Sequence, residues 1–382
     1  MTKSPSNQCF MKKKDNVSKY FWLITILVYV TILNDRLSFL NLPLSAVYVL
    51  ICFGFALNLI RKSRAACYIF LFSFLYIIYV IISPDFSVSL NSKWGMLNWT
   101  LKVMLTFFPA YYYARKNILT QKHLHYVGLG FVLIGLISYY LNINLVILDQ
   151  EYDEDGITNN VGYLFVALLP ILFVNIRKNA LLIFITYVFV LLSLKRGAIL
   201  CGIATLPFFL LLVRKQIHLS KKWIFISLLF LIVILNYVIQ DAMKENAYVE
   251  QRVEMTLKGN SSGRDKYALM IIDAIERYDM TELAVGKGIN YSMVVLGNFA
   301  HNDWFEILLS MGFLGCFAYL LTFIGIFVLI RNDCYQGYRV IGYMILLLIF
   351  IRTLLSMNYY SLDSIPLYYT LGLISRRKDY YV

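Results

Sequence analysis

Charged residues are scarce in this chain of 382 residues: they make up 15% of it, whereas a soluble globular domain has about 25%. Hydrophobic residues account for 60%. Because so few charges cannot cover the surface of a soluble fold this rich in apolar residues, the composition excludes a soluble single-core enzyme. Long charge-free apolar runs, separated by short basic loops, indicate a polytopic membrane protein instead.

The chain also lacks the alternation of polar and apolar residues that marks a membrane β-barrel. Runs such as 68–82 and 223–239 are apolar on nearly every side. At roughly 20 residues per helical span, we predict an all-α transmembrane bundle of about 12 spans. The expected spans are 20–33, 37–60, 65–82, 97–114, 124–148, 161–176, 180–194, 197–213, 223–239, 303–330, 340–357 and 362–375.

Acidic residues are nearly missing from every second loop. Most of the 35 lysines and arginines lie in the alternate loops 3–19, 61–64, 115–122, 177–178, 214–222, 331–339 and 376–378. These loops, with the last one extended to residue 379, contain only three acidic residues, Asp15, Asp333 and Asp379. The positive-inside rule places such loops in the cytoplasm, so both termini are predicted to be cytoplasmic. The net charge of +13 then matches anionic membrane lipids, and no nucleic-acid partner is expected.

Cysteine is rare and poorly placed for cross-linking. In the predicted topology Cys9 and Cys334 are cytoplasmic, and the other four of the six cysteines lie within spans. No C-x-x-C pair occurs. We therefore expect neither a disulfide framework nor a structural metal site.

Two of the predicted outer loops are not short. The loop at 149–160 is acidic but lacks the register of a calcium loop, so we expect it to be a solvated loop that faces sugar. The loop at 240–300 is too long for a passive connector. We predict that it forms an extracytoplasmic, helical catalytic loop between nine spans in 1–239 and three spans in 301–382.

Within the longer loop, Ser262-Gly263-Arg264-Asp265 looks like a helix N-cap, and apolar residues follow at helical spacing up to Ile275. Arg264 is thus expected in the first turn of a helix. Because a cation at this position opposes the helix dipole, its placement favours an anionic partner. Gly286-Lys287-Gly288 predicts a turn further along.

Histidine is scarce as well, and His301 is the only one of the four predicted to lie outside the cytoplasm and the spans. Its ordinary pKa, near 6.5, makes it the one outer side chain that exchanges protons readily near neutral pH. Taken alone, the residue is either a base or an interfacial helix cap.

His301 opens a string of the form H-N-x9-G-x-x-G that ends at Gly315. The string resembles the signature of the O-antigen polymerase and O-antigen ligase superfamily, membrane glycosyltransferases that use polyprenyl-pyrophosphate-linked glycans outside the cytoplasm. Three further stretches resemble the family's basic motif, second arginine and glycine turn: Ser193-Leu194-Lys195-Arg196-Gly197-Ala198, Ser262-Gly263-Arg264 and Gly286-Lys287-Gly288. The resemblance covers about residues 155–320. Lys195 is a departure, because relatives often carry a small polar residue there.

The resemblance implies catalytic roles for three residues. Arg196 and Arg264 would clamp the pyrophosphate of the donor, a task that suits the planar, permanently charged guanidinium. His301 would accept the proton of the attacking sugar hydroxyl. Direct displacement would invert the anomeric carbon and would need no metal or other cofactor. Without the other motifs, Arg196 would be read as an ordinary interfacial side chain.

Five further residues are candidates for substrate binding: Lys195, Asn302, Asp303, Glu306 and Arg352. Asn302 either orients the acceptor or caps a helix. Asp303, expected near water, and Glu306, expected deeper, either tune His301 or form a solvated helix end. Arg352 lies within a predicted span, so it must face protein or a watery cavity.

Two other pairs of residues follow from the same string and from the aromatic content. Gly312 and Gly315 are expected on one helical face, where they would allow another helix to pack closely. Tyr359 and Tyr360 are expected outside, where they either stack on sugar rings or anchor the interface.

The sequence thus predicts a multi-pass enzyme of the bacterial inner membrane that polymerises lipid-linked repeat units into O-antigen or capsular polysaccharide. An O-antigen ligase, which transfers the glycan to lipid A core, is the alternative that these motifs do not separate from a polymerase. A flippase or transporter is a third reading, disfavoured because no internal repeat is evident. The resemblance also implies a flippase upstream and a chain-length regulator as partners.

Overall fold

The computed structural model describes residues 5–37, 41–86, 92–149, 161–193, 195–217 and 264–375. Within these ranges every regular element is a helix, and the only extended contact is an isolated bridge between Asp85 and Ile289. The prediction of an all-α protein is therefore confirmed. The expected ninth span, the acidic loop at 150–160 and the first part of the long outer loop lie outside the described residues.

The helices follow the predicted apolar runs closely. They are α1 (Pro5–Leu37), α2 (Asn41–Ile60), α3 (Arg64–Ile82), α4 (Lys93–Leu105), α5 (Phe107–Arg115), α6 (Gln121–Asp149), α7 (Val161–Phe173), α8 (Ile176–Leu192), α9 (Arg196–Ile217), α12 (Arg264–Glu276), α13 (Met280–Val285), α14 (Tyr291–Leu296), α15 (Asp303–Asn332), α16 (Arg339–Leu355) and α17 (Ile365–Ile374). Two 3-10 turns, Gln336–Tyr338 and Leu362–Ser364, precede α16 and α17.

Several helices have the length and composition of membrane spans. Among the described residues, six are long and apolar enough to cross a membrane: α2, α3, α6, α9, α15 and α16 with its preceding turn. The segment Ser18–Asn34 of α1 and the 13-residue α7 are apolar but shorter. At 1.5 Å per residue α7 extends about 20 Å, less than the roughly 30 Å of a hydrocarbon core. The fold is a multi-pass helical bundle, and a total of twelve spans stays a prediction.

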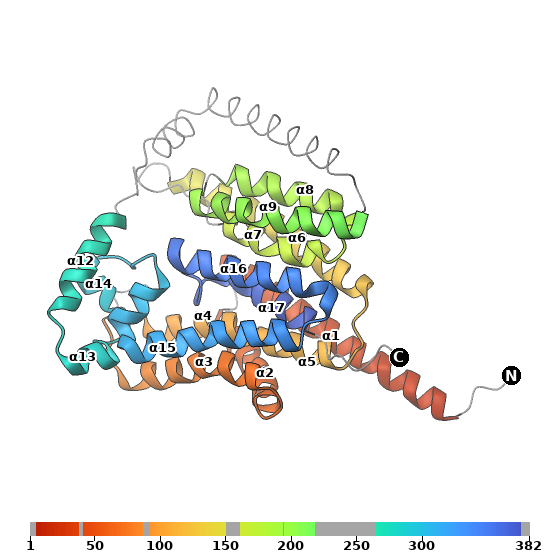
Figure 1. Ribbon diagram of the computed structural model, residues 1–382, viewed down its shortest axis with the longest axis horizontal. Helices are drawn as coiled ribbons and strands as arrows, with labels where there is room; N and C mark the ends of the chain where they lie inside the picture. The colour runs from red at the N-terminus through yellow and green to blue at the C-terminus, as the bar shows by residue number, and fades with distance from the viewer. Residues whose placement is uncertain are drawn as a thin grey trace, which may run out of the picture.

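The core of the bundle forms around α7 and α17, in which every residue is buried. Helix α7 contacts α6, α8, α9 and α17. Figure 1 shows α6 to α9 together on one side of the bundle, α3 and α15 on the other, and α16 and α17 between them. A helix that is apolar on all sides is stable only when it is enclosed in this way or surrounded by lipid.

The span expected at 97–114 is not one continuous helix. It is broken at Thr106 into α4 and α5. Pro109 lacks the N–H that would reach the carbonyl of Leu105, so the helical ladder cannot continue through this point. The hydroxyl of Thr106 donates to the carbonyl of Lys102 (2.5 Å).

The helix ends fall into two groups at opposite ends of the bundle. At one end, α12, α13 and α14 gather beside the start of α15 (Figure 1). At the other end, the Tyr111 hydroxyl of α5 donates to Asp333 (2.7 Å), directly after α15. This is the arrangement that an up-and-down topology requires.

The segment that begins at Arg264 folds into three short helices around a small core of its own. The helix expected there begins at Arg264, as predicted. Ile271, Tyr278, Ala300 and Leu309 form the buried cluster that holds the segment against α15. Helix α13 was not predicted, although Asp279 and Glu282 form a capping box at its start.

Candidate active site

His301 lies in the short connection between α14 and α15, in a backbone conformation that few side chains adopt. Its φ is 50°, in the left-handed region, which costs a non-glycine residue about 1–2 kcal/mol. Asn302 fixes the following helix, because its side-chain oxygen accepts from Trp304 N (2.9 Å) and Phe305 N (3.2 Å). Asn302 was expected either to orient the acceptor or to cap a helix, and in the structure it caps α15.

Glu306 holds the segment that precedes His301. Its carboxylate is 1% exposed and accepts from the Ser292 hydroxyl (2.7 Å) and from Ala300 N (3.0 Å). One oxygen thus fixes α14, and the other fixes the residue directly before His301. Glu306 is a positioning residue, and the solvated helix end that was its alternative reading is wrong.

Asp303 is fully buried, so the expectation that it lies near water is wrong. Its carboxylate accepts from the Tyr319 hydroxyl (2.6 Å), Asn358 N (2.8 Å) and Tyr359 N (3.3 Å). The connection between α16 and α17 has backbone N–H groups without helical partners, and once buried these groups need an acceptor. Asp303 supplies that acceptor and joins the start of α15 to this connection.

The structure brings His301 together with cations from distant parts of the chain. Burial and the charges of Arg264 and Lys195 lower the pKa of His301 from its usual 6.5. Arg264 begins α12 and Lys195 directly precedes α9. Because the protonated ring is disfavoured, the imidazole is neutral at pH 7 and has a free lone pair, which is the form that a general base requires.

Arg352 is unusual among the charged candidate residues because its side chain is fully buried. It is 0% exposed, near the end of α16, and its Nη2 donates to the Ser361 hydroxyl (3.2 Å). Its guanidinium lies 4.8 Å from the ring centroid of Tyr163. Its Nε and Nη1 have no hydrogen-bond partner among the described residues. Arg352 faces protein, as predicted, and a buried guanidinium with two unused donors is costly unless an anion binds it.

Tyr163 links Arg352 to the other arginines, and sequence reasoning did not single it out. Gly197, next to Arg196, packs closely against the Tyr163 hydroxyl, so a side chain at 197 would require the Tyr163 ring to move. The charge of Arg264 also acts on this hydroxyl. Tyr163 is one of 30 tyrosines and starts an apolar run, so no local pattern distinguishes it.

The turn predicted at Gly286-Lys287-Gly288 is present in the structure, and its contacts with α15 explain why it forms. Gly312 has φ 60° and ψ −159°, which breaks α15. The carbonyls of Leu309 and Ser310, freed by this break, accept from Lys287 N and Gly288 N (3.1 Å each). The prediction that Gly312 lies on a regular helical face is therefore wrong: it is a kink into which the glycine turn docks.

The tyrosines Tyr359 and Tyr360 have different surroundings. Tyr359 is 2% exposed and packs against the rings of Phe72 and Tyr76, so it belongs to the core. Tyr360 is half-buried, and its ring centroid lies 5.7 Å from that of Phe299. Tyr360 and Phe299 form a partly accessible aromatic pair, and Phe299 is two residues from His301 in the chain.

Comparison with known proteins adds no family assignment. A scan against protein-family models finds no match, and a search of the curated proteins finds none either. What can be said of function therefore depends on the motifs and on the site: a multi-pass helical membrane protein with a neutral histidine among cationic side chains at one end of its bundle.

Proposed function

We propose that the protein is a membrane glycosyltransferase that polymerises polyprenyl-pyrophosphate-linked oligosaccharide repeat units into O-antigen or capsular polysaccharide. It would act on the extracytoplasmic face of the bacterial inner membrane. The observation that carries the proposal is the pairing of a neutral base, His301, with the charges of Arg264 and Lys195, together with a buried Arg352 two of whose donors have no partner among the described residues. A base next to surplus positive charge suits a reaction that removes a proton from one reactant and expels an anion from the other.

The donor is the growing glycan on its lipid pyrophosphate, and the acceptor is a new lipid-linked repeat unit. An acceptor hydroxyl oxygen bonds to the anomeric carbon of the donor, while the bond from that carbon to the pyrophosphate oxygen breaks. The proton of the hydroxyl passes to His301, and the electron pair leaves with the lipid pyrophosphate. This single displacement inverts the anomeric carbon.

The arginines stabilise the leaving group. Arg196 and Arg264 offer forked donors that match phosphate oxygens in pairs, and both stay charged at any physiological pH. Arg352 adds a further positive charge, and its Nε and Nη1, which have no partner among the described residues, would donate to the same anion. Lys195 adds a further positive charge near the base. The negative charge that develops on the pyrophosphate in the transition state is the charge that these groups meet.

The aromatic pair Phe299 and Tyr360 supports a carbohydrate acceptor. Flat, partly exposed rings offer an apolar face to the C–H side of a sugar ring, and the tyrosine also carries a polar tip. Because Phe299 precedes His301 by two residues, a sugar resting on this pair would have its hydroxyls near the base.

A surface-glycan gel tests the proposal. A deletion strain that keeps its flippase and chain-length regulator is complemented with wild type or with His301→Ala at matched expression. We expect a ladder of long glycans with wild type, and core carrying a single repeat unit in the deletion and with His301→Ala. Bare core with long lipid-linked polymer would indicate an O-antigen ligase, and a full ladder with His301→Ala would refute the catalytic role of this residue.

A further inference from the structure

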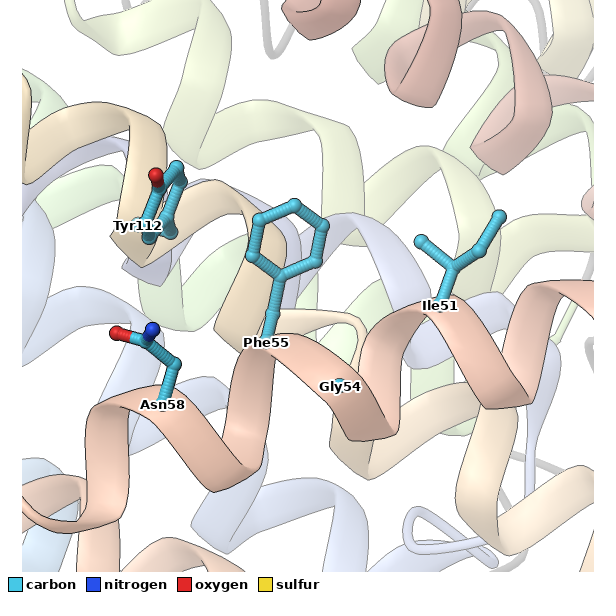
Figure 2. Close-up of a pocket in the computed structure, with 5 residues that line it drawn as sticks. All are labelled: Ile51, Gly54, Phe55, Asn58 and Tyr112. Carbon is cyan, nitrogen blue, oxygen red and sulfur yellow. The ribbon is translucent and has the colours of Figure 1, made fainter.

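A cavity of about 280 Å³ lies between α2 and α5. It is near the ends of these helices that lead into the basic loops 61–64 and 115–122. It is lined by Ile51, Gly54, Phe55, Asn58 and Tyr112. Figure 2 shows Ile51, Phe55 and Asn58 projecting from one side of α2, with Tyr112 facing them from α5. None of these residues takes part in the site described above.

The lining changes from apolar to polar along α2. Ile51, Gly54 and Phe55 form the apolar part, and the Asn58 amide with the Tyr112 hydroxyl forms the polar part. At 1.5 Å per residue, Ile51 and Asn58 are about 10 Å apart along the helix axis. The neighbouring face of α2 is apolar and exposed, with Leu50 70% accessible, so in a membrane this cavity opens towards lipid.

Two lysines stand at the polar end of the cavity. Lys62 Nζ donates to the Asn58 side-chain oxygen (2.6 Å), and Lys116 Nζ lies 5.3 Å from the ring centroid of Tyr112. Both lysines are exposed, so each can take an additional ligand. An ammonium group on a flexible stem is well suited to a phosphate oxygen.

A second lipid-facing cavity provides a comparison. It has a volume of about 450 Å³ and lies between α15 and α16, lined by Phe323, Ile324, Phe327, Tyr343, Leu346, Leu347 and Phe350. No charged side chain lines it. Neither cavity is lined directly by a charged side chain, but Lys62 and Lys116 contact two lining residues of the cavity between α2 and α5.

We infer that the cavity between α2 and α5 binds an anionic phospholipid of the adjoining leaflet. The phosphodiester lies between Lys62 and Lys116, the glycerol region contacts Asn58 and Tyr112, and one acyl chain follows Ile51 and Phe55. A cavity of about 280 Å³ is slightly smaller than the roughly 300–1,000 Å³ typical of small-molecule sites, so it holds the head of a lipid and not the whole molecule. The apolar part and the exposed face of α2 favour a lipid over a free phosphate compound.

Native mass spectrometry of the delipidated, full-length protein tests this inference. Phosphatidylglycerol and phosphatidylcholine with the same acyl chains are titrated into wild type, Lys62→Gln/Lys116→Gln and the charge-matched control Lys178→Gln/Lys215→Gln. Gly54→Leu is a further variant, because Gly54 lines the cavity and a Cβ at this position meets nothing within 4 Å, so a larger side chain is expected to occupy the cavity.

We expect wild type and the control to bind phosphatidylglycerol about tenfold more tightly than phosphatidylcholine, the difference that 1.4 kcal/mol produces. Lys62→Gln/Lys116→Gln should lose this preference, and Gly54→Leu should weaken the binding of both lipids. Equal binding of phosphatidylglycerol by all four proteins would overturn the site. Displacement of the lipid by free glycerol 3-phosphate would overturn the assignment to a lipid.

Discussion

His301 owes its proposed role to three influences on one imidazole: burial, the charge of Arg264 and the charge of Lys195. All three disfavour the protonated ring and lower its pKa, so the neutral base is present at pH 7. The base form is lost only when the pH falls through the lowered pKa, which lies below the usual 6.5. The fold thus keeps the histidine ready to accept a proton under mildly acidic conditions.

The lowered pKa of His301 predicts the direction in which the reaction rate changes with pH. In wild type, kcat/KM should fall on the acid side at a pH below 6.5. Lys195→Gln removes one cation, raises the pKa of His301 and should move this fall to higher pH. Lys266→Gln, an exposed lysine of α12, is the charge-matched control and should leave the profile unchanged. An acid limb that moves to lower pH in Lys195→Gln would contradict the account.

The role of Glu306 is tested by comparing two substitutions. Glu306→Ala removes the carboxylate oxygens that accept from the Ser292 hydroxyl and from Ala300 N, and the resulting misplacement of His301 should lower kcat about 10²-fold. Glu306→Gln should keep most activity, since its oxygen can still accept from Ala300 N while its amide donates to a reversed Ser292 hydroxyl. If Glu306 acted through its charge, Glu306→Gln would instead lose activity and shift the pH profile.

For single residues, the sequence predicted which residue types belong to the site better than it predicted which residues contact one another. The helix start at Arg264 and the cap at Asn302 depend on neighbouring residues, so local patterns predict them. The burial of Asp303 depends on Asn358, 55 residues away, and no local pattern contains that pairing. Arg352 and Tyr163 are even farther apart in the sequence, so no local pattern predicts their contact either.

Among the elements, α15 shows why a glycine pattern is ambiguous. The spacing of Gly312 and Gly315 fits one helical face, yet Gly312 adopts φ 60° and bends the helix. Spacing alone carries no information about a dihedral angle. The same limit applies to α4 and α5, where Pro109 offered the signal for the break that a purely hydrophobic reading of 97–114 overlooked.

The kink at Gly312 leads to a prediction about stability, and Gly297 provides the control. Alanine at Gly297, which has φ 68° and open space around it, should cost only the left-handed conformation, about 1–2 kcal/mol. Alanine at Gly312 should cost more, because its Cβ would also lie 2.6 Å from backbone atoms of Leu283, Ala284 and Gly286. Thermal unfolding in detergent should therefore give a lower midpoint for Gly312→Ala than for Gly297→Ala. Equal midpoints would mean that the turn does not dock on the kink.

For the whole molecule, the long apolar runs and the scarcity of charge were sufficient to predict a helical membrane bundle, because helices that face lipid must be apolar. Six helices with the properties of spans agree with this expectation. Short helices such as α7 were harder to interpret, since a 13-residue helix can be enclosed by its neighbours without crossing the bilayer.

The orientation in the membrane is a separate prediction. Basic loops at the end of the bundle opposite His301 should lie in the cytoplasm. In a chain whose six native cysteines are replaced, Asn298→Cys should react with an impermeant maleimide in intact spheroplasts. Arg61→Cys should react only after permeabilisation. The reverse pattern would place the candidate site in the cytoplasm, where a lipid-linked glycan acceptor is not displayed.

The most direct test of the account is a cell-free polymerisation by the purified protein, with a polyprenyl-pyrophosphate-linked oligosaccharide as both donor and acceptor. Wild type should produce a ladder of longer lipid-linked glycans. His301→Ala should form it about 10²- to 10⁴-fold more slowly, as expected for loss of a general base, while it still binds the donor. A ladder formed by His301→Ala at the wild-type rate would contradict the central claim.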